Sequence, residues 1–95
     1  MSKYEAMYVI DTAVEDEARK ALIEKFNAVV TANGGTVESV DEWGKRRLAY
    51  PINYKNEGYY VLMQLEAEPT LPKELERNFQ ISDDVLRYLV TKKGE

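Results

Sequence analysis

The sequence predicts an α+β protein with the ferredoxin-like order βαββαβ, in which a four-stranded antiparallel sheet carries two helices on one face. Three observations predict this fold. Period-two alternation of apolar residues marks extended segments near both ends and in the middle of the chain. Apolar residues spaced three and four apart mark two helices, and the order of these segments allows both crossovers to place their helices on the same side.

The first strand is expected over residues 3–10. Tyr4, Tyr8 and Ile10 fall on the inward face, together with Ala6. A helix should follow, because Thr12 and Glu15 have the spacing of a capping box. Its core stripe and its stop signal come next in the chain: Ala18, Leu22, Phe26, Val29 and Val30, and then Asn33-Gly34-Gly35.

Residues 36–52 read as one long extended run. Gly44 interrupts the alternation, which predicts a bulge or bend near it. Leu48 and Tyr50 are expected to resume the inward face, and Pro51 predicts an edge strand because proline donates no ladder hydrogen bond. A turn is expected over residues 53–58 and a third strand over residues 59–66.

Pro72 suits the first turn of a second helix, whose core stripe is Leu71, Leu75 and Phe79. The last strand is expected over residues 85–92. Its inward residues are predicted to be Leu86, Tyr88 and Val90, with Val85, Arg87, Leu89 and Thr91 facing the other way. The 95 residues are predicted to form a single domain, residues 1–95, with a frayed tail over residues 92–95.

Two helices on one side leave the other sheet face without cover. The alternation places five apolar or aromatic residues on this helix-free face, which we predict to be a patch for a partner protein. They are Met7, Val9, Tyr60, Leu62 and Leu89. Scattered apolar residues on a surface are the competing explanation, since most folded proteins expose some.

Composition disfavours catalysis. The chain has no histidine and no cysteine, so the usual general base near neutral pH and the thiol nucleophile are both absent. No calcium-loop spacing and no phosphate-binding glycine loop occurs, so we expect no enzyme, metal, cofactor or small-molecule substrate. No signal core or membrane-spanning run is present, which predicts a cytoplasmic protein with no membrane partner.

Charge is unevenly distributed along the chain. The net charge is −4, yet residues 43–55 contain four basic residues and no acid. Lys45, Arg46, Arg47 and Lys55 are these four, and such a strip can neutralise phosphates in an otherwise acidic protein. The alternative is that these cations only keep an exposed hairpin soluble and prevent edge-to-edge pairing.

The same stretch carries a resemblance to a known family. The run GKRRLAYPI over residues 44–52 is similar to the signature of the bacterial small ribosomal subunit protein six family. The segments DEW at 41–43, YVLM at 60–63 and DVLRYLV at 84–90 also fit, so the resemblance spans roughly residues 4–92. It implies a ferredoxin-like ribosomal protein that is not an enzyme. It also implies two partners, the central domain of 16S ribosomal RNA and small-subunit protein eighteen.

The RNA contacts expected from the residues themselves are Lys45, Arg46, Arg47, Tyr54, Lys55 and Arg87. Lys45 and Arg47 should share one face of their strand and Arg46 the other. Arginine grips phosphate with two hydrogen bonds, while Tyr54 is suited to stack on an unpaired base. Tyr50 is expected to pack inward. Trp43 is expected to pack beside the bend.

Three other functions use this topology. A stand-alone RNA-recognition module needs outward aromatic residues on the central strands, where only Tyr60 qualifies. A small phosphate-ester or acyl-phosphate hydrolase needs an arginine-bearing loop after the first strand, and residues 10–13 contain none. A ligand-sensing regulatory domain that dimerises sheet to sheet is allowed by the helix-free face, and fold alone does not choose among these.

Overall fold

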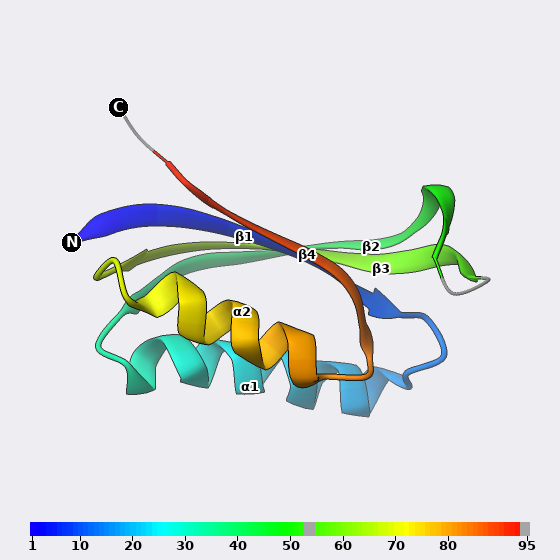
Figure 1. Cartoon of the computed structure of the whole chain (residues 1–95). Helices are drawn as coiled ribbons and strands as arrows, with labels where there is room; N and C mark the ends of the chain where they lie inside the picture. Colours follow the sequence, from blue (N-terminus) through cyan, green and yellow to red (C-terminus); the bar gives the residue numbers. More distant parts are fainter. Residues whose placement is uncertain (53–54, 94–95) are drawn as a thin grey trace.

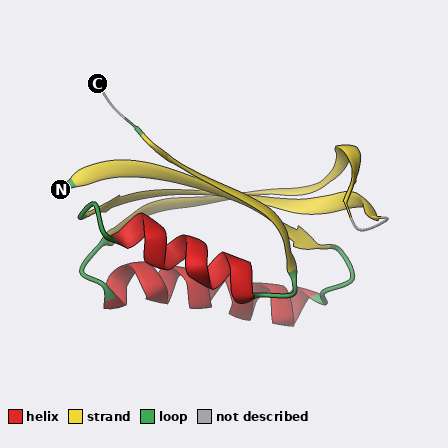
Figure 2. Ribbon diagram, viewed as in Figure 1, coloured by secondary structure: helices red, strands yellow, loops and turns green. Residues whose placement is uncertain are grey.

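The computed structural model describes the backbone of residues 1–52 and 55–93. It describes the side chains of residues 1–48 and 56–93. The elements follow the order β1 (Ser2–Asp11), α1 (Asp16–Ala32), β2 (Thr36–Ile52), β3 (Lys55–Ala67), α2 (Leu71–Ile81) and β4 (Val85–Lys92). The strands form one antiparallel sheet in the order β2-β3-β1-β4. Both helices lie on the same face of this sheet, and the other face has no helix over it (Figures 1 and 2). The predicted ferredoxin-like fold is confirmed.

Aromatic residues form the centre of the core between the sheet and the helices. Tyr8 of β1 contacts Phe26 of α1 and Phe79 of α2, with ring centroids 5.1 and 4.9 Å apart. Phe26 and Phe79 meet edge to face at 4.7 Å, and Phe79 also lies 5.5 Å from Tyr88 of β4. Edge-to-face and offset pairs of this kind add to the energy gained by burying the rings. One cluster therefore joins both helices to the two adjacent strands.

Glycine and proline end and start the helices where the sequence predicts. Gly34 has a φ of 84° after α1, and the backbone N–H of Gly35 donates to the Val30 carbonyl at 2.9 Å. These contacts satisfy carbonyls at the helix end that have no partner within the helix. Pro72 lies in the first turn of α2, and Leu71, Leu75 and Phe79 are buried as predicted.

The start of α1 differs from the prediction. Glu15 is the N-cap residue and makes no side-chain capping bond, so the capping box of Thr12 and Glu15 is absent. Instead, Asp11 Oδ1 accepts a hydrogen bond from the Ala13 backbone N–H at 2.9 Å. This turn takes the chain out of β1 before the helix begins. In the helix itself, Ile23 is buried with Phe26 and Val30, while Ala18 is exposed.

A register shift between β1 and β4 changes which face a residue of β4 occupies. The register of β1 with β4 shifts between Val9 and Ile10, so Leu86 has no partner and Val85 packs on the core. The predicted outward position of Val85 is therefore wrong, and Leu86 is not among the described residues that pack on the core. β3 begins at Lys55, which makes the predicted turn over residues 53–58 too long. β2 is an edge strand, as Pro51 predicted.

The distal part of β2 bends away from the helix layer (Figure 1). Leu48 is buried there, but it lies outside the main core. Its Cδ2 atom approaches the place that a Gly58 Cβ would occupy, beside Val9 on the helix-free side. The predicted inward position of Leu48 is therefore wrong, because Leu48 lies two residues after Arg46 and shares its helix-free side.

Candidate functional site

Three consecutive cations on β2 form what we call the cationic ribbon: Lys45, Arg46 and Arg47. Each pairs with a residue of β3: Lys45 with Tyr59, Arg46 with Gly58 and Arg47 with Glu57. Because side chains alternate along a strand, Arg46 projects on the helix-free side and the other two on the helix side. All three are exposed, and their side chains make no ion pair or hydrogen bond with the described part of the chain.

The side chains of two predicted RNA contacts lie outside the part of the chain that the structure describes. Tyr54 lies outside the described residues, and so does the side chain of Lys55, whose backbone pairs with Ile52 at the start of β3. The side chain of Tyr50 is likewise outside. Their predicted roles remain predictions.

A bulge in β2 precedes the ribbon, where the sequence predicted one. Glu42 pairs with Val61 and Gly44 with Tyr60, so Trp43 is the extra residue without a partner on β3. Gly44 has a φ of 84°, a left-handed conformation that glycine adopts without a steric penalty. The indole of Trp43 lies parallel to the Tyr60 ring, with centroids 6.3 Å apart and planes 7° apart. The bulge thus turns Trp43 onto the helix-free face.

A second group of contacts ties the base of the ribbon to α1. The guanidinium of Arg19 lies 3.9 Å from the centroid of the Tyr59 ring and pairs with Asp16 at 2.9 Å. The Tyr59 hydroxyl donates to Glu42 Oε1 at 2.8 Å. Partial burial, followed by this bond to the Glu42 carboxylate, raises the pKa of Tyr59. Since Tyr59 faces Lys45 across the two strands, these contacts fix the start of the ribbon.

Close packing of glycine against β1 shapes the bend of the hairpin. A Cβ atom at Gly58 would lie 2.1 Å from Val9 Cγ1 and 3.4 Å from Leu48 Cδ2. The first distance is far below any real contact of a Cβ atom, so the absence of a side chain at Gly58 lets Val9 pack there. Val9 is 3% exposed as a result and has little surface left for a partner.

The predicted partner patch occupies neighbouring positions on three strands. Met7 pairs with Leu62 on one side and Leu89 on the other, while Val9 pairs with Tyr60 and Arg87. Leu89 is the most exposed of the apolar members, at 56%, and Met7, Tyr60 and Leu62 are half-buried. These residues lie on the sheet face that the helices leave open.

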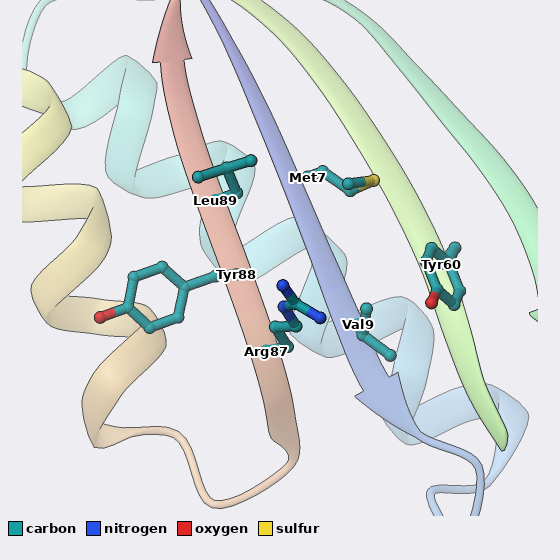
Figure 3. A pocket seen from close by; sticks show the side chains of 6 residues that line it. All are labelled: Met7, Val9, Tyr60, Arg87, Tyr88 and Leu89. Carbon is teal, nitrogen blue, oxygen red and sulfur yellow. The ribbon is translucent and has the colours of Figure 1, made fainter. Parts of the chain in front are cut away.

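A shallow pocket of about 170 Å³ lies within this patch. Met7, Val9, Tyr60 and Leu89 line it together with Arg87, whose guanidinium lies over the sheet between β4 and β1 (Figure 3). Tyr88 points away from the patch toward α2.

Comparison with known proteins settles the family. A family model described as ribosomal protein S6 matches residues 3–92. The chain belongs to the ribosomal protein S6 family. The family predicted from the ribbon and its flanking segments is thereby confirmed.

Individual relatives agree over nearly the whole chain. Small ribosomal subunit protein bS6 of Exiguobacterium sibiricum is 56% identical over 92 residues, covering 97% of each chain. The Clostridium novyi protein of the same name is 53% identical over 90 residues, covering 95% of each. A crystal structure of 30S ribosomal protein S6 from Thermotoga maritima has a TM-score of 0.93 at 26% identity, covering 97% of this chain and 87% of that one.

Two further observations concern other classes of function. The described residues contain no group of three or more acidic, histidine or cysteine side chains that is placed to bind a metal ion. No helix in the described ranges is long and apolar enough to cross a membrane.

Proposed function

We propose that the chain is a structural component of the small ribosomal subunit, where it binds the central domain of 16S ribosomal RNA as a pair with small-subunit protein eighteen. The observation that carries the RNA part is the cationic ribbon. Its three side chains are exposed and uncompensated within the described part of an otherwise acidic chain. Charged side chains that are not paired internally are available to phosphates.

The two surfaces suit different partners. The ribbon lies on an edge strand, which a folded RNA can approach without displacing protein. The helix-free face presents Met7, Leu62 and Leu89, and burying these side chains removes apolar area from water. We therefore assign the ribbon to RNA, and the part of the helix-free face formed by Met7, Leu62 and Leu89 to protein eighteen.

The acidity of the chain fits a paired mode of binding. Outside residues 43–55 the chain is strongly acidic, so isolated protein should be repelled by RNA. A basic partner would be attracted by the same charge and would bring the pair to the RNA. We expect weak RNA binding by the chain alone and strong binding by the pair.

RNA binding across a salt series tests this function. A 16S central-domain fragment is titrated with the chain, with protein eighteen and with both, between about 50 and 200 mM salt, a range over which phosphate contacts weaken binding strongly. Equal affinity of protein eighteen with and without the chain would remove the proposal.

Two variants then assign the contacts to the ribbon. Arg46→Ala and Arg47→Ala should each lower the slope of log affinity against log salt by about one for a lost phosphate contact. Lys73→Ala is the matched control, because Lys73 is an exposed cation near the start of α2, and this end of α2 lies at the opposite end of the molecule from the β2–β3 hairpin (Figure 1). An unchanged slope in both arginine variants would reassign the ribbon to solubility.

A further inference from the structure

Trp43, the sole tryptophan of the chain, is 42% exposed although it is held in a defined place. Its indole Nε1–H donates to Asp41 Oδ2 at 3.2 Å, and its ring lies parallel to that of Tyr60. These two contacts restrict both side-chain torsions of Trp43. A flat apolar surface is therefore fixed toward solvent, and a planar ligand would lose little free energy in ordering it.

The position of Trp43 depends on the bulge. In a regular strand, the face on which a side chain lies follows from strict alternation along the chain. Here Trp43 is an extra residue and Gly44 has a left-handed backbone, so the alternation is interrupted at Trp43. Bulges of this kind re-aim side chains and are frequent beside functional sites. The local backbone is thus arranged to present the indole on the same side as Arg46.

Charge decides which class of partner fits this surface. The ribbon begins two residues after Trp43, and Arg46 lies on the same face of the strand. A basic protein would be repelled by three uncompensated cations, whereas a polyanionic strand would be attracted. The neighbouring carboxylates of Asp41 and Glu42 keep their negative charge while they accept hydrogen bonds from Trp43 and Tyr59, and the three cations of the ribbon outnumber them.

We propose that Trp43, supported by Tyr60, is a stacking platform for one unpaired base of ribosomal RNA, with Arg46 binding a phosphate of the same strand. The proposal rests on the proposed function and deepens it. Aromatic side chains stack on bases of every kind, and arginine grips phosphate through two hydrogen bonds. The indole N–H is already donated to Asp41, so this site recognises the plane of a base and not its sequence.

Fluorescence of the sole tryptophan tests the proposal on the unaltered chain. Emission is recorded for the chain, for the pair with protein eighteen, and for the pair with the 16S central-domain fragment. The pair containing Trp43→Phe gives the background from protein eighteen and is subtracted. We expect strong quenching when RNA is added and little change when protein eighteen alone is added.

Affinity of matched variants gives a second measure. Trp43→Leu keeps an apolar side chain but cannot stack, so the pair should bind RNA about 5- to 150-fold more weakly, the range measured for loss of one stacked base. Trp43→Phe keeps an aromatic face and should bind within about threefold of the original pair. Thermal unfolding checks that both variants keep the fold, which the exposure of Trp43 leads us to expect.

The outcomes separate this proposal from the proposed function. If the pair binds RNA, but Trp43 emission is unchanged and Trp43→Leu binds normally, the stacking platform is refuted and the proposed function stands. An emission change on adding protein eighteen alone, with none on adding RNA, assigns Trp43 to the protein interface and also refutes the platform. Absence of RNA binding by the original pair refutes both.

Discussion

Gly58→Ala tests how the hairpin is packed against β1. The new Cβ would lie 2.1 Å from Val9 Cγ1, about 1.3 Å closer than the 3.4 Å at which ordinary contact begins. Neither strand can easily move away, because Gly58 pairs with both Asp11 and Arg46. Overpacking of a core costs about 1–3 kcal/mol, and the fixed backbone on both sides places this variant near the upper end. A loss of about 2–3 kcal/mol lowers the melting temperature by about 8–24 °C in a domain of this size.

Thermal unfolding followed by circular dichroism measures this effect, with Val9→Ala and the double variant completing a cycle. Val9→Ala removes the atom that clashes, so the double variant should be more stable than the sum of the single changes by at least about 1 kcal/mol. Gly44→Ala is the control. Its Cβ would meet no atom within 4 Å, and only the left-handed backbone adds a cost of about 1–2 kcal/mol. Additive effects in the cycle, or a Gly58→Ala protein that melts within about 4 °C of the original, would refute the packing argument.

Three further predictions concern two tyrosines and a glycine. Burial, and then the Glu42 carboxylate, raises the pKa of Tyr8 above the ordinary value of 10, and burial also raises that of Tyr59. Since both pKa values are higher in the folded state, the free energy of unfolding is constant with respect to these groups below pH 10 and falls as pH rises beyond it, which denaturant titration from pH 8 to 11 will show. Tyr8→Phe should make this alkaline loss smaller. It should also stabilise the protein by about 1 kcal/mol at neutral pH, because the buried hydroxyl has no hydrogen-bond partner in the described part of the chain; a large destabilisation would contradict this. Gly35→Ala should destabilise by about 1–3 kcal/mol in the same titration, because its Cβ would lie 2.9 Å from Val30 Cγ1 and 3.1 Å from the Glu66 carbonyl oxygen. Stability equal to the original would show that Val30 yields freely.

Periodicity and local stop signals were sufficient to predict the order of the elements. The alternation of residues 3–10 gave β1, and Leu71, Leu75 and Phe79 gave the buried stripe of α2. The glycines at 34 and 35 ended α1 as expected. These signals are local, so they survive whatever the rest of the chain does.

Bulges limited what the alternation could predict. Each extra residue moves every later side chain of its strand to the other face. Among the bulges of the described strands, only the one at Gly44 contains a glycine from which it could be predicted. The shift at Leu86 brought Val85 onto the core side, against the alternation. After the bulge at Gly44, Leu48 falls on the helix-free side near Gly58, and Val9 of the non-adjacent strand β1 packs against the same glycine, an arrangement that no local pattern contains.

The sequence predicted the charged part of the candidate site, but not the contacts that hold its aromatic residues. The charge pattern located the cationic ribbon and its alternation, because exposed cations need no tertiary partner. It did not show that Trp43 stacks on Tyr60, since this contact needs the register across the bulge. The link from Arg19 to Tyr59 was also missed, as it joins a helix to a strand 40 residues later in the chain.

Site-directed photocrosslinking in reconstituted small subunits tests most directly the assignment of two surfaces to two partners. Benzoylphenylalanine is placed at Lys45 in one protein and at Leu89 in another, and both positions are exposed. We predict crosslinks from position 45 to 16S ribosomal RNA and from position 89 to protein eighteen. Crosslinks from position 89 to RNA and from position 45 to protein would contradict the account.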